Sequence, residues 1–314
     1  MKDNLGRNIN YLRLSVTQRC NLNCIYCGSE CPDMNEMTAD EIRQAVEAFA
    51  LCGIDKVRLT GGEPLVRADI AEIAEQISGI DGIKKLVLTT NGVNLKKYAA
   101  DLKNAGVSAV NVSIDSLDRE NYKRITGRDC LLQVLEGLDE AEKAGLKLRV
   151  NAVLVRGEND SEAEKLINLA RDRKIDVRFI ELMPFSDAGK NEKLIIKGDE
   201  ILKKFDFLKP VEMKKKVFEQ SVARYYEADG FKGQIGLITP VSEKFCDECN
   251  RVRLLSDGKI KPCLGHDETY DLRPCFGDRE KMLEVIKTAI LSKPKGHEFN
   301  CGYGNTHAMN KIGG

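Results

Sequence analysis

The chain has 314 residues, of which 42% are hydrophobic and 31% charged, a composition typical of a folded protein with a large core. Lysine plus arginine equals aspartate plus glutamate, 49 each, so no overall field recruits nucleic acid or an anionic membrane. The N-terminus lacks the apolar run of a signal peptide, and no stretch approaches the roughly 18 apolar residues of a membrane helix. We therefore expect a cytoplasmic protein whose 11 cysteines stay reduced and serve metal or redox chemistry.

Strand-like and helical patterns alternate over the first 180 residues. We predict strands at 11–16, 56–59, 85–89, 109–114, 147–153 and 177–181. Between the first two lies a helix pattern in which Thr38 and Glu41 form a capping box and Gly53 suits the C-terminal stop. Such repeats predict a parallel sheet, either doubly wound or an incomplete barrel. Because polar residues follow several of these strands, we expect the ligand site at the carboxyl ends of the strands.

A cysteine loop, CNLNCIYC, follows the first predicted strand and contains Cys20, Cys24 and Cys27. Structural zinc sites favour paired CxxC knuckles, whereas three thiolates in this loop suit three corners of a [4Fe–4S] cluster with one iron left open. Cys31 leaves an alternative, because CIYCGSECP echoes the end of a ferredoxin run. On that interpretation all four irons are ligated and the loop only carries electrons.

The alternation of strand and helix patterns ends after Met183, where a charged and irregular segment begins. We place a domain boundary there, with one domain at 1–184 and a second at 185–314. The MKKK run at 213–216 is interpreted as a solvated surface. Cys52 lies on a helical pattern and is expected in the core.

A second cysteine module lies in the C-terminal part of the chain and contains Cys246, Cys249, Cys263 and His266. Taken alone, its CxxC…CxxH spacing fits a zinc site with three cysteines and the histidine as ligands. Arg251 and Arg253 alternate directly behind this CxxC, so in an extended segment both point to one face. Two guanidiniums suit an anionic cluster and an anionic substrate better than a zinc cation, which favours a second iron–sulfur cluster.

Three motifs together resemble known enzymes. The CxxxCxxC loop, with Tyr26 before its last cysteine and TGGEP after the next strand, resembles the radical S-adenosylmethionine (SAM) superfamily. The second cysteine module with its RxR, and the final MNKIGG, resemble the molybdenum-cofactor biosynthesis protein A (MoaA) family, the GTP 3′,8-cyclases. This resemblance implies an incomplete (β/α)6 TIM-type barrel with a C-terminal α+β domain closing the open side. It also implies two [4Fe–4S] clusters and S-adenosyl-L-methionine as cofactors.

The resemblance also assigns site residues, motif by motif. Cluster ligands would be Cys20, Cys24 and Cys27 for cluster 1, and Cys246, Cys249 and Cys263 for cluster 2. SAM-binding residues would be Tyr26, Gly62, Ser113 and Met183. GTP-binding residues would be Arg13, Arg58, Thr89, Arg149, Arg251, Val252 and Arg253. Catalytic residues would be Arg178, Gly313 and Gly314. The open iron of the second cluster would then take the guanine base, and His266 would not be a ligand.

The implied reaction is a radical cyclisation of GTP. A 5′-deoxyadenosyl radical takes hydrogen from C3′ of the ribose, the C3′ radical attacks C8, and an electron and a proton complete (8S)-3′,8-cyclo-7,8-dihydroguanosine 5′-triphosphate. The implied partners are a flavodoxin or ferredoxin-type electron donor, a downstream cyclic pyranopterin monophosphate synthase (MoaC) and a second copy of the chain in a homodimer. Two alternatives stay open: a two-cluster radical SAM enzyme that modifies a peptide or another substrate, and an iron–sulfur electron carrier or zinc-binding module. Cys130, Cys275, Cys301 and the region 266–312 receive no role.

Overall fold

The computed structural model describes residues 1–27, 35–211, 222–297, 299 and 308–313. Cys31, Cys301, Gly314 and the 213–216 run lie outside these residues. The described strands form one sheet in the order β12-β11-β10-β1-β2-β3-β4-β5-β6-β9-β8-β7. Their bounds are β1 Tyr11–Ser15, β2 Lys56–Thr60, β3 Lys85–Thr90, β4 Val107–Ser113, β5 Lys147–Leu154, β6 Asp176–Glu181, β7 Lys209–Pro210, β8 Arg224–Glu227, β9 Ile235–Ile238, β10 Arg251–Leu254, β11 Lys259–Lys261 and β12 Tyr270–Asp271.

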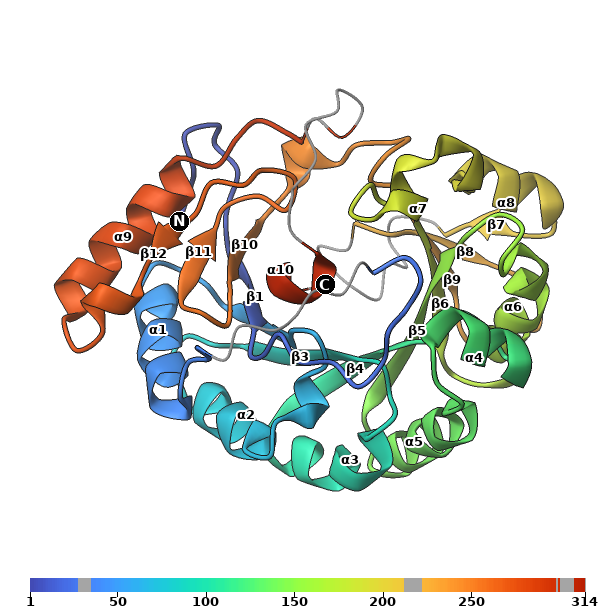
Figure 1. The fold of residues 1–314 in the computed structure, drawn as a ribbon, viewed down its shortest axis with the longest axis horizontal. Coiled ribbons are helices and arrows are strands. Elements are labelled where there is room, and N and C mark those ends of the chain that lie inside the picture. Colours follow the sequence, from blue (N-terminus) through green and yellow to red (C-terminus); the bar gives the residue numbers. More distant parts are fainter. Residues whose placement is uncertain (28–34, 212–221, 298, 300–307, 314) are drawn as a thin grey trace.

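The sheet curves into a partial barrel around a central space (Figure 1). From β10 through β1–β6 to β9 all neighbouring strands run parallel. Short antiparallel strands follow at both edges, β11 and β12 beside β10, and β8 and β7 beside β9. Because β12 and β7 are the two ends of this order, the barrel is not closed within the described residues. The predicted incomplete barrel is therefore confirmed.

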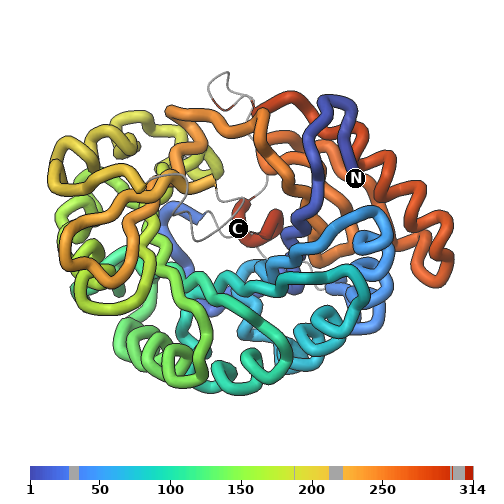
Figure 2. Tube along the Cα trace, turned by 180° about the vertical axis from the view of Figure 1, so that it is seen from behind, coloured from blue at the N-terminus to red at the C-terminus, as the bar shows by residue number. Residues whose placement is uncertain are grey.

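Helices α1 to α6 cover the outside of the curved sheet, as both views of the backbone show (Figures 1 and 2). The described helices are α1 Ala39–Leu51, α2 Ile70–Ser78, α3 Leu95–Asn104, α4 Arg119–Thr126, α5 Leu131–Lys143, α6 Ala163–Asp172, α7 Asp187–Lys190, α8 Gly198–Lys204, α9 Arg279–Leu291 and α10 Met309–Ile312. Their apolar faces and the outward side chains of the strands form the main hydrophobic core. The inward faces of the strands are thereby left for polar residues.

The six strands predicted from the sequence are confirmed, with each boundary within two residues of the observed one. The capping box of α1 is present, since Thr38 Oγ1 accepts from the Glu41 backbone N–H and the Glu41 carboxylate accepts from the Thr38 N–H. Cys52 caps the end of this helix and is buried in the core, as expected. Local rules therefore predict the first six strands well.

The C-terminal half of the chain supplies strands to both sides of the first six. β10 pairs with β1, and β9 pairs with β6. Residues on both sides of residue 184 thus share one sheet, and the division into domains at that point stays a prediction.

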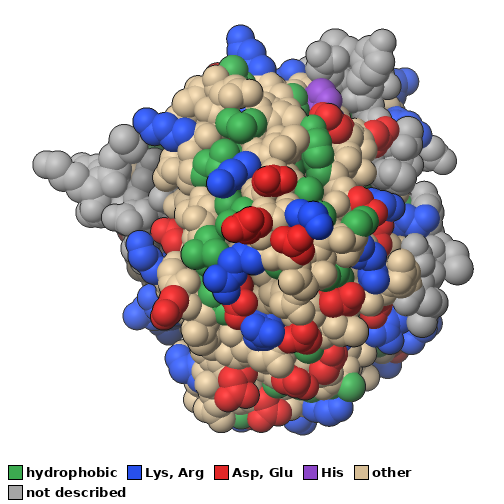
Figure 3. Space-filling view, turned by 90° about the vertical axis from the view of Figure 1, so that its left-hand side faces the viewer, with side chains coloured by type: hydrophobic (Ala, Val, Ile, Leu, Met, Phe, Trp, Pro, Cys, Tyr) green, Lys and Arg blue, Asp and Glu red, His purple; other side chains and the backbone are tan. Residues whose placement is uncertain are grey.

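The surface that carries α1 and α9 mixes acidic and basic side chains without a large area of one sign (Figure 3). This mixture agrees with the balanced composition of the whole chain. Within the part of the chain that the structure describes, no helix is long and apolar enough to cross a membrane.

Candidate functional site

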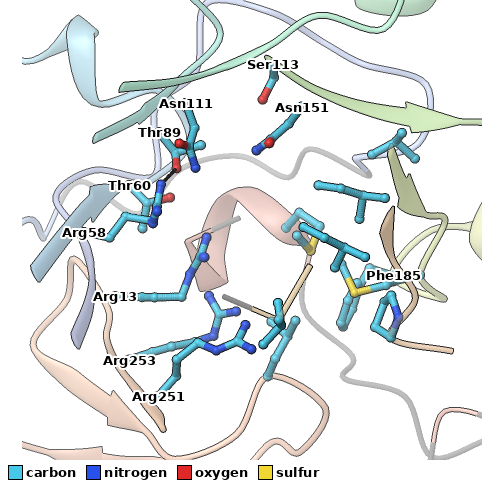
Figure 4. Close-up of a pocket in the computed structure, with 18 of the residues that line it drawn as sticks. Arg13, Arg58, Thr60, Thr89, Asn111, Ser113, Asn151, Phe185, Arg251 and Arg253 are labelled. Atoms are coloured by element: carbon cyan, nitrogen blue, oxygen red, sulfur yellow. Dashed lines mark hydrogen bonds between the residues drawn. The ribbon is translucent and has the colours of Figure 1, made fainter. Parts of the chain in front are cut away.

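The inside of the barrel holds a cavity of about 410 Å³, within the range of ligand pockets. Its wall follows the two-residue period of a strand, because alternate side chains point inward. The inward pairs include Tyr11 and Arg13 on β1, Lys56 and Arg58 on β2, Asn111 and Ser113 on β4, Arg149 and Asn151 on β5, and Arg251 and Arg253 on β10. Figure 4 shows several of these side chains directed toward one space. Because the side chains that point inward are mostly polar or basic, the inside of the barrel is polar and strongly basic.

The two cysteine triads lie at opposite edges of the sheet. Cys20 follows the carboxyl end of β1, whereas Cys249 lies two residues before the amino end of β10, which runs parallel to β1 with Tyr11 opposite Arg251. β11 is antiparallel to β10, so Cys263 also returns to the amino edge. All six thiol-bearing residues line the same cavity. The expectation of a site only at the carboxyl ends of the strands was wrong for the second triad, because Cys246 and Cys249 precede the amino end of β10.

The separation between the two edges follows from strand geometry. β1 has five residues, and a strand rises roughly 3.3 Å per residue, so its length is about 16 Å. The inward arginines occupy the strands between the triads. A ligand held by these arginines would therefore lie between the two groups of cysteines.

At the carboxyl edge, the first triad lies among neutral and acidic groups, with Cys20 exposed and Cys24 and Cys27 half-buried. Burial, followed by the charge of Asp115, raises the pKa of the Cys24 thiol, and burial raises that of Cys27 to about 11. Asp115 accepts a hydrogen bond from Tyr26 Oη and another from the Val153 N–H. As isolated groups these thiols stay protonated near neutral pH, so their thiolate form requires a bound cationic centre. Such a donor set fits an iron–sulfur cluster.

Gly61 and Gly62 of the TGGEP turn lie against the backbone that leads into this cysteine loop. A Cβ at Gly61 would meet the Thr17 carbonyl oxygen at 2.4 Å, and one at Gly62 would meet the Arg19 carbonyl oxygen at 2.5 Å. Gly62 also lines the cavity. Close packing of two backbone segments therefore requires these glycines.

At the amino edge, the second triad is surrounded by cations. Burial alone would raise the pKa of the Cys249 thiol, but the charges of Arg251 and Lys293 outweigh it and lower that pKa. Arg251 lies over the Phe245 ring, 5.1 Å from its centroid, and its Nη2 is buried with no hydrogen-bond partner in the described structure. This environment favours anionic thiolates and leaves a guanidinium nitrogen for a ligand.

His266 does not join the second triad on the cavity wall. Its ring Nε2 instead makes a hydrogen bond of 2.8 Å with the carbonyl oxygen of Gly296. In the described chain, no three Cys, His, Asp or Glu side chains converge as they do around one metal ion. A cubane cluster has no need of such convergence, because each thiolate binds a different iron.

The buried arginines form a positive region that a phosphate chain would neutralise. Burial and the neighbouring Arg253 hold the pKa of Arg13 well below its usual value, and burial lowers the pKa of Arg178 to about 10. Burial and Arg251 lower the pKa of Arg253 to about 10. Arg58 donates to Thr89 Oγ1 at 2.8 Å, drawn as a dashed line in Figure 4. A buried array of like charges is costly unless an anion enters it.

The pKa of Tyr11 shows how strongly the buried cations act on a neighbouring group. Burial would raise its pKa, but Arg58, Arg13 and Lys56 outweigh burial and lower it to about 7. Its hydroxyl accepts a hydrogen bond from Arg58 Nε. A phenol that ionises near neutrality indicates that the cavity stabilises negative charge strongly.

The C-terminal segment lies inside the barrel, where Figure 1 shows α10 at the centre. Arg253 Nη1 donates to the Gly313 carbonyl oxygen at 2.6 Å. Gly313 has φ +70°, and a Cβ there would meet Ser15 Cβ at 2.9 Å. At the other end of α10, the Met309 N–H donates to the Cys27 carbonyl oxygen. This segment therefore contacts both the first cysteine loop and the arginine cluster.

The cavity brings together most of the residues assigned from the sequence. It includes Tyr26, Gly62, Ser113, Met183, Arg13, Arg58, Thr89, Arg149, Arg178, Arg251 and Arg253. Val252 differs, because strand alternation turns its side chain into the hydrophobic core. Their roles as ligands of SAM or GTP stay predictions.

Sequence reasoning missed several residues of the cavity wall. Lys56 and Tyr11 precede assigned arginines by two positions, so strand alternation could have identified both. Asn151 and Asp115 follow the assigned Arg149 and Ser113 by two positions, so the same rule could have found them. Lys293 follows α9 in a region without any recognisable pattern.

Comparisons with known proteins agree along the whole chain. The Radical SAM superfamily profile matches residues 14–170, and the Molybdenum Cofactor Synthesis C profile matches residues 175–299. A GTP 3′,8-cyclase of Alkaliphilus oremlandii is 46% identical over 100% of both chains. One of Peptoclostridium acidaminophilum is 42% identical over 99% of this chain and 98% of its own.

A likeness in structure extends to more distant proteins. Streptococcus suis SuiB bound to S-adenosylmethionine superposes with a TM-score of 0.63 at 16% identity, over 90% of this chain and 68% of SuiB. That likeness shows a common fold, while the identity to the cyclases extends over the full length of the sequence. The chain therefore belongs to the radical SAM superfamily and, within it, to the GTP 3′,8-cyclase family.

Proposed function

We propose that this protein is a radical SAM lyase that converts GTP into (8S)-3′,8-cyclo-7,8-dihydroguanosine 5′-triphosphate, the first step of molybdenum cofactor biosynthesis. Relatives named GTP 3′,8-cyclase match it over its full length. The single structural observation that carries the proposal is one cavity containing two cysteine triads and a row of buried arginines between them. An electron carrier or a zinc module has no use for such a cavity.

Cys20, Cys24 and Cys27 would hold the cluster that binds SAM, and the reduced cluster would supply the electron that cleaves the sulfonium bond of SAM into methionine and a 5′-deoxyadenosyl radical. Tyr26, Gly62, Ser113 and Met183 line the same cavity and would bind the cofactor. Asp115 fixes the Tyr26 hydroxyl from inside the barrel. The enclosed site would keep water away from the reacting atoms.

The arginines would hold GTP between the triads. Arg13, Arg58, Arg149, Arg251 and Arg253 present planar guanidiniums, which match paired phosphate oxygens and keep their charge at working pH. Thr89 would contact the nucleotide through its hydroxyl, and Val252 through its backbone. Binding at several points fixes the ribose in the cavity, which is the main contribution that the protein makes to a radical cyclisation.

The second triad would hold a cluster whose open iron takes the guanine base. Cys246, Cys249 and Cys263 supply three thiolates, and His266 is bonded to backbone elsewhere. Arg178 and the C-terminal glycines, Gly313 and Gly314, would assist the rearrangement. Gly313 is well placed for that role, because Arg253 holds its carbonyl oxygen inside the barrel.

Anaerobic reconstitution tests the proposal directly. The reduced protein is incubated with SAM and GTP, and the products are examined by mass spectrometry. We expect 5′-deoxyadenosine together with a cyclised nucleotide. Formation of neither product would overturn the proposed function, and 5′-deoxyadenosine without any GTP binding would favour a peptide-modifying enzyme.

The pathway context suggests further partners. The reaction needs one-electron reduction, so a flavodoxin or ferredoxin-type protein would supply the electron. A cyclic pyranopterin monophosphate synthase (MoaC) would consume the product. We expect the protein and both partners to be located in the cytoplasm. We also expect the chain to form a homodimer. Sedimentation of the reconstituted protein tests the last point, since a monomer at working concentration would contradict it.

A further inference from the structure

Lys293, just beyond the end of α9, is a buried lysine on the wall of the cavity and has no part in the reaction proposed above. Its side chain is only 5% exposed. Its Nζ donates two short hydrogen bonds, one of 2.8 Å to the carbonyl oxygen of Arg251 and one of 2.6 Å to that of Pro262. A buried ammonium is costly, so a position that retains one requires an explanation.

The two carbonyl groups belong to the segments that carry two of the second-triad cysteines. Arg251 follows Cys249 by two residues, and Pro262 directly precedes Cys263. The ammonium therefore bridges the start of β10 and the segment after β11. By fixing both backbones it fixes the separation of the two thiols.

The third cysteine is held by the residues that follow Lys293. A Cβ at Gly296 would lie 3.3 Å from Cys246 Sγ, and the His297 backbone N–H donates to that thiol. Arg7 Nη1 donates to the Cys246 carbonyl oxygen at 3.0 Å and to that of Lys295 at 3.1 Å. The 293–297 segment and Arg7 thus contact all parts of the second triad.

Charge distinguishes this triad from the first. Arg7 pairs with Asp3 at 2.6 Å, whereas Lys293 makes its bonds to neutral carbonyl groups. Arg251 and Lys293 line the cavity together with Cys249 and Cys263. A cluster on three thiolates carries net negative charge and gains more on reduction, so a nearby buried cation stabilises the reduced form.

We infer that Lys293 is a positioning residue for the second cluster, holding the Cys249 and Cys263 segments at cluster spacing and raising the reduction potential of the centre by its charge. This inference rests on the proposed function, because it needs an iron–sulfur cluster on the second triad. It adds a residue outside the set of thiols and arginines that contact cluster or substrate.

The test isolates the second cluster in the full-length chain. Cys24→Ala/Cys27→Ala removes the first cluster, so iron content and the electron paramagnetic resonance signal then report the second cluster alone. Lys293→Met is compared in this background with Lys293→Arg, which keeps the charge and the donors. Lys281→Met is the matched control, because Lys281 is an exposed residue of α9 that pairs with Asp278. The midpoint potential is measured by redox titration.

We expect a more negative midpoint potential in Lys293→Met, no shift in Lys281→Met, and recovery in Lys293→Arg. Failure of Lys293→Met to assemble the cluster, with assembly restored by arginine, also supports the inference. It is overturned if Lys293→Met has the potential and spectrum of the control. It is equally overturned if neither variant at 293 assembles the cluster and both melt early, since Lys293 is then a general packing residue. A parent protein with no cluster on the second triad would instead contradict the proposed function.

Discussion

Arg253 on β10 donates a 2.6 Å hydrogen bond to the carbonyl oxygen of Gly313, 60 residues further along the chain. The guanidinium expected to bind a phosphate chain therefore also holds the C-terminal segment inside the barrel. If Arg253 binds the phosphate chain as proposed, substrate binding and placement of this segment are coupled through one side chain.

The glycine at 313 is expected to be essential for the reaction but not for folding. Gly313→Ala forces a residue with a side chain to adopt φ +70°, at about 1–2 kcal/mol, and drives its Cβ to 2.9 Å from Ser15 Cβ. We expect formation of the cyclised product to fall at least about tenfold, by the cost of one displaced contact, while 5′-deoxyadenosine still forms.

Gly157→Ala is the matched control, because Gly157 has φ +77° and a Cβ at this position would meet nothing within 4 Å. It carries the same backbone strain without the steric contact. Equal activities in the two variants would show that Gly313 has no special role.

Arg251 is expected to bind nucleotide without contributing to cluster assembly. Its buried Nη2 has no hydrogen-bond partner among the described residues, so a phosphate oxygen can take it. Loss of a charge-assisted hydrogen bond costs about 1.5–3 kcal/mol, so Arg251→Ala should weaken GTP binding about 10- to 100-fold. Calorimetry measures the affinity and metal analysis the iron.

The exposed Arg171, which pairs with the neighbouring Asp172 on the surface, serves as control through Arg171→Ala. If Arg251→Ala lost iron and the control did not, the side chain would be structural rather than a ligand of GTP.

Tyr11 is expected to ionise near neutral pH in the ligand-free protein. Its pKa is lowered to about 7, against 10.0 for an ordinary tyrosine, because Arg58, Arg13 and Lys56 outweigh burial. The folded-state pKa lies below the unfolded one, so the resulting stabilisation is fully present above pH 10 and is lost as the pH falls through 7.

Ultraviolet absorbance of the phenolate checks this ionisation, with Tyr11→Phe as the reference protein. GTP should raise the pKa, since its phosphates neutralise the same cations. The stability difference between the two proteins should grow from pH 7 to pH 10. A tyrosine signal with no step near neutrality would contradict the electrostatic account of the cavity.

His266 is expected to be dispensable for metal binding. Its ring is engaged with the Gly296 carbonyl oxygen at 2.8 Å. His266→Ala should therefore keep full iron content and lose only about 1 kcal/mol of stability, the value of one hydrogen bond. Thermal unfolding and metal analysis measure the two effects. Selective loss of metal from the second triad would restore the zinc interpretation.

Much of the barrel could be predicted because its information is local. The capping box at Thr38 and Glu41 and the apolar strand patterns depend on residues close together in the sequence. Arg251 and Arg253 could likewise be placed on one face by strand alternation alone. The same rule should have removed the side chain of Val252 from the site, since it lies between them.

Other features depend on pairings that no local pattern encodes. The position of the second triad follows from β10 lying parallel to β1, which joins segments about 240 residues apart. Lys293 donates hydrogen bonds to backbone carbonyl groups, and the positions of these groups cannot be inferred from the types of residue in the sequence. Gly61 and Gly62 pack against the Thr17 and Arg19 carbonyl groups, a contact that the TGGEP motif by itself does not reveal.

The pairing of β9 with β6 and of β10 with β1 has a consequence for synthesis of the protein. Until the last third of the chain leaves the ribosome, the first six strands expose unpaired backbone at both margins, which is a template for intermolecular association. Long-range pairing of this kind is also slow. A fragment ending near residue 184 should therefore precipitate. In the intact chain β10 and β9 pair with the two margins and cover their backbone groups.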